Sequence, residues 1–168
     1  TSLRLANRVT IRHSSVRTRM LDIASKLDDV IALGRGDPDL DTPAHIVEAG
    51  RKALADGATH YTHPLGMPSL REAIAAAIQG EGGGAYAADE IVVTAGAQES
   101  MFVAMLALVN RGEEVIIPSP GYNSYHQAVE LAEGVVVTVP TYERDGFALT
   151  AEAVEKHLTP QSRMLCLI

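Results

Sequence analysis

Short apolar runs alternate with longer amphipathic stretches along the second half of the chain. From Glu90 onward the short runs have the length and composition of strands, and the longer stretches repeat apolar residues at helical spacing. The predicted strands are 91–94, 114–117, 135–139 and 163–168, and the predicted helices are 98–109, 122–132 and 150–158. Several strands are apolar throughout, which is typical of a parallel sheet covered by helices on both faces. The pattern therefore predicts an α/β fold with a mainly parallel central sheet.

The first 90 residues have a helical pattern that is interrupted by turns. Apolar residues at helical spacing predict helices at 15–27, 43–56 and 68–79. A proline at the start and a glycine at the end support the last two of these helices. The later helix at 98–109 is apolar nearly all round, so we expect it to be buried.

One joint between a strand and a helix has the composition of an anion-binding site. In the stretch IVVTAGAQES, from Ile91 to Ser100, a β-branched strand passes through small residues directly into a predicted helix. The first N–H groups of a helix lack intrahelical acceptors, and its dipole is positive at this end. Backbone amides there can bind a phosphate. A plain packing turn is the alternative at this point.

Composition and charge narrow the class of protein. The chain has 168 residues, 46% hydrophobic and 21% charged, which is enough for one well-buried core. No apolar run approaches the roughly 18–20 residues that span a membrane, and we expect no secretory leader. The net charge of −7 argues against a nucleic-acid surface. Cys166, the single cysteine, lies in an apolar run, which favours a buried structural thiol and a cytoplasmic protein.

The first 19 residues differ in charge from the rest, because they hold five arginines and no acidic residue. An organelle transit peptide can have this composition, but the segment continues into a helical pattern. A solvated N-terminus, or an arm that wraps a second subunit, is the interpretation we favour.

Four segments together resemble one enzyme family. These segments are IALGRGDPDLDTP, HYTHPLGMPSLREA, IVVTAGAQESMF and IIPSPGYNSY. They resemble, in order and spacing, the N-terminal half of the class I/II aminotransferases, which are fold-type-I pyridoxal-phosphate enzymes. The resemblance implies a three-layer large domain, truncated on its C-terminal side. It places an N-terminal arm and part of a small domain at 1–42, and the first portion of the cofactor-binding large domain at 43–168.

The resemblance assigns cofactor contacts to four of these residues. Gly96, Ala97 and Gln98 match the loop whose amides hold the phosphate of pyridoxal phosphate, which agrees with the local physics of a helix N-terminus. Tyr122 matches the aromatic ring that stacks on the pyridine ring of the cofactor. The alternative for Tyr122 is packing against the sheet.

The resemblance also assigns roles to two residues nearer the N-terminus. Tyr61 matches a tyrosine whose hydroxyl reaches the phosphate in the neighbouring subunit, which implies a homodimer with shared active sites. Gly36 matches a glycine whose backbone approaches the α-carboxylate of the substrate. A loop aromatic and a plain turn are the respective alternatives. His60 and His63 flank Tyr61 without a third ligand pattern, so we predict no metal site.

The lysine that such catalysis requires is not evident in this chain. Lys26, Lys52 and Lys156 all lie on predicted helices and lack the family's sequence setting for a reactive lysine. The resemblance implies that the Schiff-base lysine follows Ile168, so no catalytic residue is assigned here. We expect this chain alone to be inactive.

The favoured function is transfer of an amino group between an amino acid and a 2-oxo acid. A pyridoxal-phosphate lyase, either a C–S lyase or a decarboxylase, is the first alternative, because the same fold supports several chemistries. A non-catalytic ligand-binding domain of this fold is the second. The amino donor and acceptor are not predicted.

Overall fold

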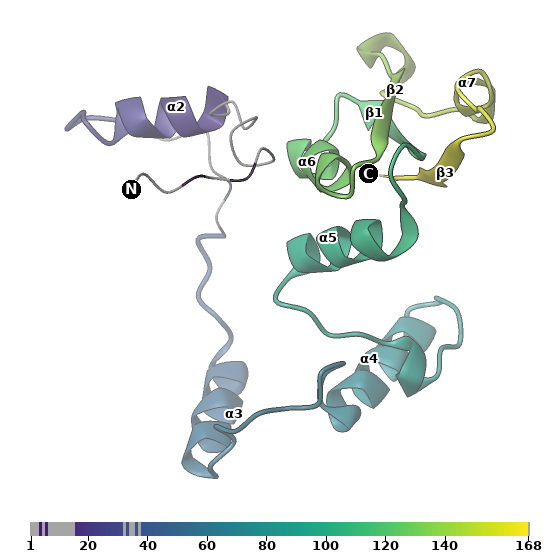
Figure 1. Cartoon of the computed structure of the whole chain (residues 1–168). Coiled ribbons are helices and arrows are strands. Elements are labelled where there is room, and N and C mark those ends of the chain that lie inside the picture. The colour runs from purple at the N-terminus through teal and green to yellow at the C-terminus, as the bar shows by residue number, and fades with distance from the viewer. Residues whose placement is uncertain are drawn as a thin grey trace. The chain divides into compact units, whose positions relative to one another are not determined.

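The computed structural model describes residues 4, 6, 16–31, 33, 36 and 38–167 (Figure 1). The chain divides into two compact units, Thr1–Tyr61 and Thr62–Ile168, and each is described by itself. The boundary predicted between residues 42 and 43 rests on the family resemblance and stays a prediction.

The first unit contains two of the predicted helices. Helix α2 spans Val16–Ala24, and α3 spans Ala44–Ala55. Pro43 stands at the N-cap of α3, where its fixed φ and missing N–H are tolerated. Gly57 follows the helix with φ 83°, a left-handed conformation that favours glycine. Proline and glycine therefore mark the ends of α3 as the sequence predicts.

The second unit begins with a helix and a short helical turn. Helix α4 spans Pro68–Gly80, and the 3-10 turn η1 spans Ala88–Glu90. The two elements contact each other, and the Arg71 guanidinium donates from Nη1 to the carbonyl of Ala88 at 3.0 Å. This bond holds α4 against the segment that leads into residues 91–96.

A parallel sheet forms the centre of the second unit. Its strands are β1 at Glu114–Ser119, β2 at Val135–Pro140 and β3 at Ser162–Leu165. Both β2 and β3 pair with β1 in parallel, so the strand order is β2-β1-β3 (Figure 1). Ile116 of β1 lies between Val137 and Leu165 in this register. The predicted mainly parallel sheet is confirmed.

The central strand is buried on both faces. Val115 and Ile117 are fully buried and join the core that α5 and α6 also contribute to. Ile116 points to the opposite face, because side chains alternate along a strand, and it is only 1% exposed. Burial on both faces explains why this strand is a continuous apolar run rather than an alternating one.

Three helices follow the predicted alternation with the strands. Helix α5 spans Ala97–Leu108, α6 spans Asn123–Leu131, and α7 spans Ala151–Glu155, with the 3-10 turn η2 at Glu143–Asp145. Helix α6 contacts both α5 and β2. Helix α7 is shorter than the predicted 150–158, since Thr150 is its N-cap and residues 156–157 form a turn.

Two expectations about secondary structure and burial are wrong. Residues 91–94 form no strand: the N–H of Val93 bonds to the carbonyl of Leu65 at 3.0 Å, and no neighbouring strand among residues 38–167 pairs with the segment. Helix α5 is not buried all round. Met105 is buried, but Val103 and Leu106 are 50% and 57% exposed, because packing within the described chain reaches only part of this helix.

Candidate functional site

The turn before α5 has a backbone conformation that only glycine adopts readily. Gly96 is the N-cap of α5, with φ 85° and ψ 165°. Its N–H donates to the carbonyl of Thr94 at 2.8 Å, and the Thr94 hydroxyl donates to the carbonyl of Gly96 at 3.0 Å. These two bonds fix the turn, so the direction in which α5 begins is set by the local sequence.

The N-terminus of α5 offers backbone donors to a ligand. The Gly96 carbonyl accepts from the N–H groups of Glu99 and Ser100, at 3.2 and 3.4 Å. The N–H groups of Ala97 and Gln98 precede these in the first turn, where a helix provides no acceptor of its own. No side chain caps the helix. A Cβ placed on Gly96 would meet nothing within 4 Å, so the space beside the turn is open.

A carboxylate also lies at this helix end. Glu99 is in the first turn of α5, and its Oε2 accepts a hydrogen bond from the N–H of Ala95. The negative charge is favourable beside the positive end of the helix dipole but repels a bound phosphate. The sequence interpretation missed Glu99. Its position three residues after the N-cap, typical of a capping box, could have revealed it.

A side-chain hydrogen bond links the start of α5 to the start of α6. The Gln98 amide donates from Nε2 to the Ser124 hydroxyl oxygen at 2.7 Å. Ser124 is only 8% exposed and is the second residue of α6. The sequence interpretation missed Ser124 as well, because the two partners are 26 residues apart and no local spacing connects them.

Tyr122 immediately precedes α6 as its N-cap residue. Its side chain is 50% exposed, and its ring makes an edge-on contact with Tyr125 at a centroid distance of 6.4 Å and an interplanar angle of 82°. The ring is therefore supported from one side and accessible over part of its surface. This arrangement is compatible with stacking on a flat ligand.

The segment before Tyr122 is anchored at the carboxyl end of the sheet. The carbonyl of Ser119, the last residue of β1, accepts from both the N–H and the hydroxyl of Thr141, at 2.7 and 3.0 Å. Thr141 is buried and directly follows β2. Ligands of open parallel α/β sheets bind beyond the carboxyl ends of the strands, which is where Tyr122 lies in the chain.

Gly36 and Tyr61 belong to the first unit. Gly36 is exposed, and a Cβ added to it would meet nothing within 4 Å. The side chain of Tyr61 is fully exposed. The structure thus brings together the α5 turn and α6 within the second unit, whereas the roles of Gly36 and Tyr61 stay predictions.

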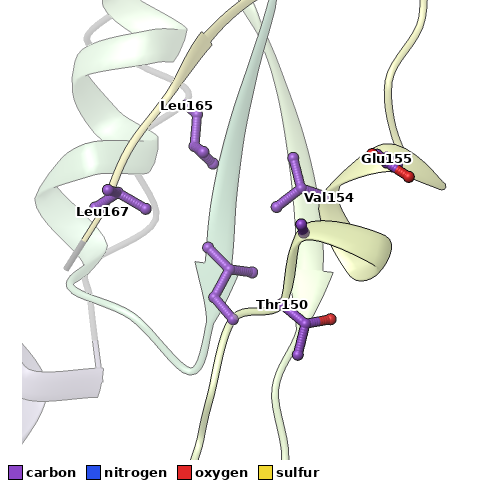
Figure 2. A pocket seen from close by; sticks show the side chains of 7 residues that line it. Thr150, Val154, Glu155, Leu165 and Leu167 are labelled. Atoms are coloured by element: carbon purple, nitrogen blue, oxygen red, sulfur yellow. The ribbon is translucent and has the colours of Figure 1, made fainter.

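Two cavities lie within the second unit. One, of about 300 Å³, is lined by Thr150, the N-cap of α7, by Val154 within α7, and by Leu165 and Leu167 in and after β3 (Figure 2). The other, of about 220 Å³, lies beside Pro120 and shares Leu167 with the first. Neither cavity gathers the polar groups that a catalytic site needs, so we assign no chemistry to them.

The residues that the structure describes contain neither a candidate metal cluster nor a membrane-spanning helix. There, no three His, Cys, Asp or Glu side chains lie close enough together to hold a metal ion. No helix in the same residues is long and apolar enough to cross a bilayer.

With this geometry in place, sequence comparison defines the class of protein. Residues 28–167 match the sequence profile of aminotransferase class I and II, so the chain belongs to that family. It is 41% identical over 151 residues to a probable aspartate/prephenate aminotransferase of Thermus aquaticus, covering 90% of this chain and 39% of that protein. It is 40% identical over 164 residues to an aspartate aminotransferase of Pyrococcus abyssi, covering 96% of this chain and 42% of that protein.

Solved structures give the same result for the fold. A double mutant of Thermus thermophilus aspartate aminotransferase superposes with a TM-score of 0.93 at 38% identity, covering 98% of this chain and 44% of that one. Rhizobium meliloti aspartate aminotransferase gives a TM-score of 0.89 at 39% identity, covering 98% of this chain and 42% of that one. The predicted aminotransferase-like fold is confirmed, and the chain spans about two fifths of the length of the relatives it matches.

Aminotransferases of class I and II depend on pyridoxal phosphate, and the second unit has features that fit this cofactor. A positive-φ glycine, an uncapped helix N-terminus and open space beside the turn suit a phosphate. The half-exposed ring of Tyr122 suits the flat pyridine. The carboxylate of Glu99 opposes a dianion, although its side chain is exposed to solvent, which screens its charge.

Proposed function

We propose that the protein containing this chain is a pyridoxal-phosphate-dependent aminotransferase, an enzyme of amino acid metabolism. It transfers an amino group between an amino acid and a 2-oxo acid. The observation that carries this proposal is the N-terminus of α5, where Gly96 opens an uncapped helix and Gln98 is bonded to the helix that follows Tyr122. Membership of the family supports the assignment of the reaction.

In this proposal the residues of the second unit bind and orient the cofactor. The turn at Gly96 presents the N–H groups of Ala97 and Gln98 to its phosphate, and the ring of Tyr122 stacks on its pyridine and limits its tilt. The bound cofactor supplies an electron sink for the electron pair left when the substrate loses its α-proton. Gly36 leaves room for the α-carboxylate of the substrate, because it has no side chain.

We further propose a cytoplasmic homodimer in which Tyr61 reaches the phosphate held by the partner subunit. The complete exposure of Tyr61 supports this role, since a large aromatic side chain on the surface of one unit is available to a second chain. The buried, unpaired thiol of Cys166 is compatible with a reducing compartment.

An amino-transfer assay tests the proposed function. The purified protein that contains this chain is incubated with pyridoxal phosphate, 2-oxoglutarate and one amino acid at a time, and the glutamate formed is measured. The printed names of the relatives make aspartate and the aromatic amino acids the first donors to test. We expect glutamate to form with at least one donor. If no donor yields glutamate, the other products identify the alternative. Release of ammonia and a 2-oxo acid from cysteine would indicate the C–S lyase, and release of amines from amino acids would indicate the decarboxylase.

A further inference from the structure

The first turns of α5 and α6 are joined by the hydrogen bond between Gln98 and Ser124. We propose that Ser124 is a positioning residue: its bond to Gln98 sets the spacing between the phosphate-binding N-terminus of α5 and the ring of Tyr122. This inference rests on the proposed function, because it assumes that one ligand contacts both helix starts.

The burial of the two partners indicates which one positions the other. Ser124 is 8% exposed and sits on a short side chain in the first turn of α6, so its hydroxyl has little freedom. Gln98 has a long, exposed side chain that gains a fixed orientation from the bond. Helices α5 and α6 also pack against each other, so the bond ends on a rigid neighbour.

The hydroxyl of Ser124 is not used to cap its own helix. Serines near a helix N-terminus commonly accept a hydrogen bond from a nearby backbone N–H. No side chain caps α6, and the Ser124 oxygen instead accepts from Gln98 on another helix. This bond therefore fixes the position of α5 relative to α6, whereas a capping bond would only stabilise the end of α6.

The two ligand-binding groups lie next to this bond along the chain. Gly96 is two residues before Gln98, and Tyr122 is two residues before Ser124. A ligand with both a phosphate and an aromatic ring gains affinity when its two sites are held at the right spacing. A ligand with only one of these groups gains little, because it contacts a single helix start.

The test is a double-mutant cycle in the protein containing this chain, freed of cofactor. Ser124→Ala, Gln98→Leu and the double variant are titrated by calorimetry with pyridoxamine 5′-phosphate, which cannot form a Schiff base with a lysine. Pyridoxamine and inorganic phosphate are measured by competition. We expect each single variant to bind pyridoxamine 5′-phosphate about tenfold more weakly, and the two smaller ligands to change by less than about twofold. The double variant should bind no more weakly than either single one.

Ser162→Ala is the matched control. Ser162 is also part-buried and donates to Oε2 of Glu114, but Glu114 begins β1, at the other end of that strand from the segment leading to Tyr122. This control should leave all three affinities unchanged. Equal weakening of all three ligands by Ser124→Ala, additive effects in the double variant, or no effect would each overturn the inference. Failure of the unsubstituted protein to bind pyridoxamine 5′-phosphate would instead refute the proposed function.

Discussion

At the scale of single residues, Glu99 bears most directly on anion binding at α5. Its carboxylate accepts from the N–H of Ala95 at the helix end where we place the phosphate. A like charge within a few ångströms weakens phosphate binding, while the hydrogen bond itself stabilises the free turn. Glu99 therefore lowers the affinity for the cofactor, but it stabilises the turn when no phosphate is bound.

The Glu99→Gln variant tests this role of charge. We expect it to bind pyridoxamine 5′-phosphate about three- to tenfold more tightly, because the amide keeps the size of the side chain and removes the repulsion. Calorimetric titration at two salt concentrations measures the effect, and screening should reduce the gain at high salt. Glu152→Gln is the matched control, since Glu152 lies in the first turn of α7. Weaker or unchanged binding by Glu99→Gln would contradict repulsion by its charge.

At the scale of elements, the end of β3 joins the core through Cys166. Cys166 is 8% exposed, its backbone N–H donates to the carbonyl of Ile116 at 2.9 Å, and burial raises the pKa of its thiol above the usual value. Because the pKa of the thiol is higher in the folded state, the protonated thiol contributes its full stabilisation at pH values below the pKa of an exposed thiol. This contribution declines as the pH rises through the alkaline range towards the folded pKa.

Thiol labelling tests the burial of Cys166. In the native protein at pH 8 we expect alkylation of the Cys166 peptide at least about tenfold slower than in the same protein unfolded in urea, since both access and the thiolate fraction are lower. Mass spectrometry of the digested protein reads the modification at this peptide. Equal rates in the two states would show that β3 does not end in the core.

Much of this element order could be predicted from the sequence. β1 and β2 are mostly apolar, and Gly96 marks the start of α5, so the local pattern was enough to predict these three elements. Residues 91–94 have the same apolar composition but form no strand, because a strand requires a paired neighbour and composition cannot supply one. Likewise, the apolar residues of α5 are buried only where another element covers them, and composition alone does not show where that is.

The candidate site could be predicted in part, for the same reason. The local pattern indicates a candidate anion site at this helix N-terminus, and the family resemblance assigns it to Gly96, Ala97 and Gln98. Ser124 is not, since its bond to Gln98 depends on how α6 packs against α5. Interactions between elements distant in the chain are the part that sequence patterns leave undetermined.

At the scale of the whole molecule, the proposed dimer predicts that two defective subunits can complement each other. Tyr61→Ala removes the contribution to the partner's site, and Gly96→Val blocks the phosphate turn of its own subunit. A mixed dimer then has one intact site, formed by the turn of the first variant and Tyr61 of the second. Random mixing should therefore restore about a quarter of the unsubstituted activity.

The complementation is measured after the two inactive variants are unfolded and refolded together. Each variant refolded alone provides the control. Activity no greater than the sum of the two controls, with dimers present by analytical ultracentrifugation, would show that the sites are not shared.

The proposed function depends on binding of the cofactor's phosphate at the N-terminus of α5. Gly96 and Gly112 offer a matched pair, since both have positive φ, at 85° and 81°, and neither has an atom within 4 Å of an added Cβ. Alanine is disfavoured at positive φ in both turns, at a cost of about 1–3 kcal/mol each.

Calorimetric titration of pyridoxamine 5′-phosphate into the cofactor-free Gly96→Ala and Gly112→Ala proteins tests the claim most directly. We expect about tenfold weaker binding for Gly96→Ala and unchanged binding for Gly112→Ala, because only the first distorts the phosphate turn. Equal affinities in the two variants would contradict it.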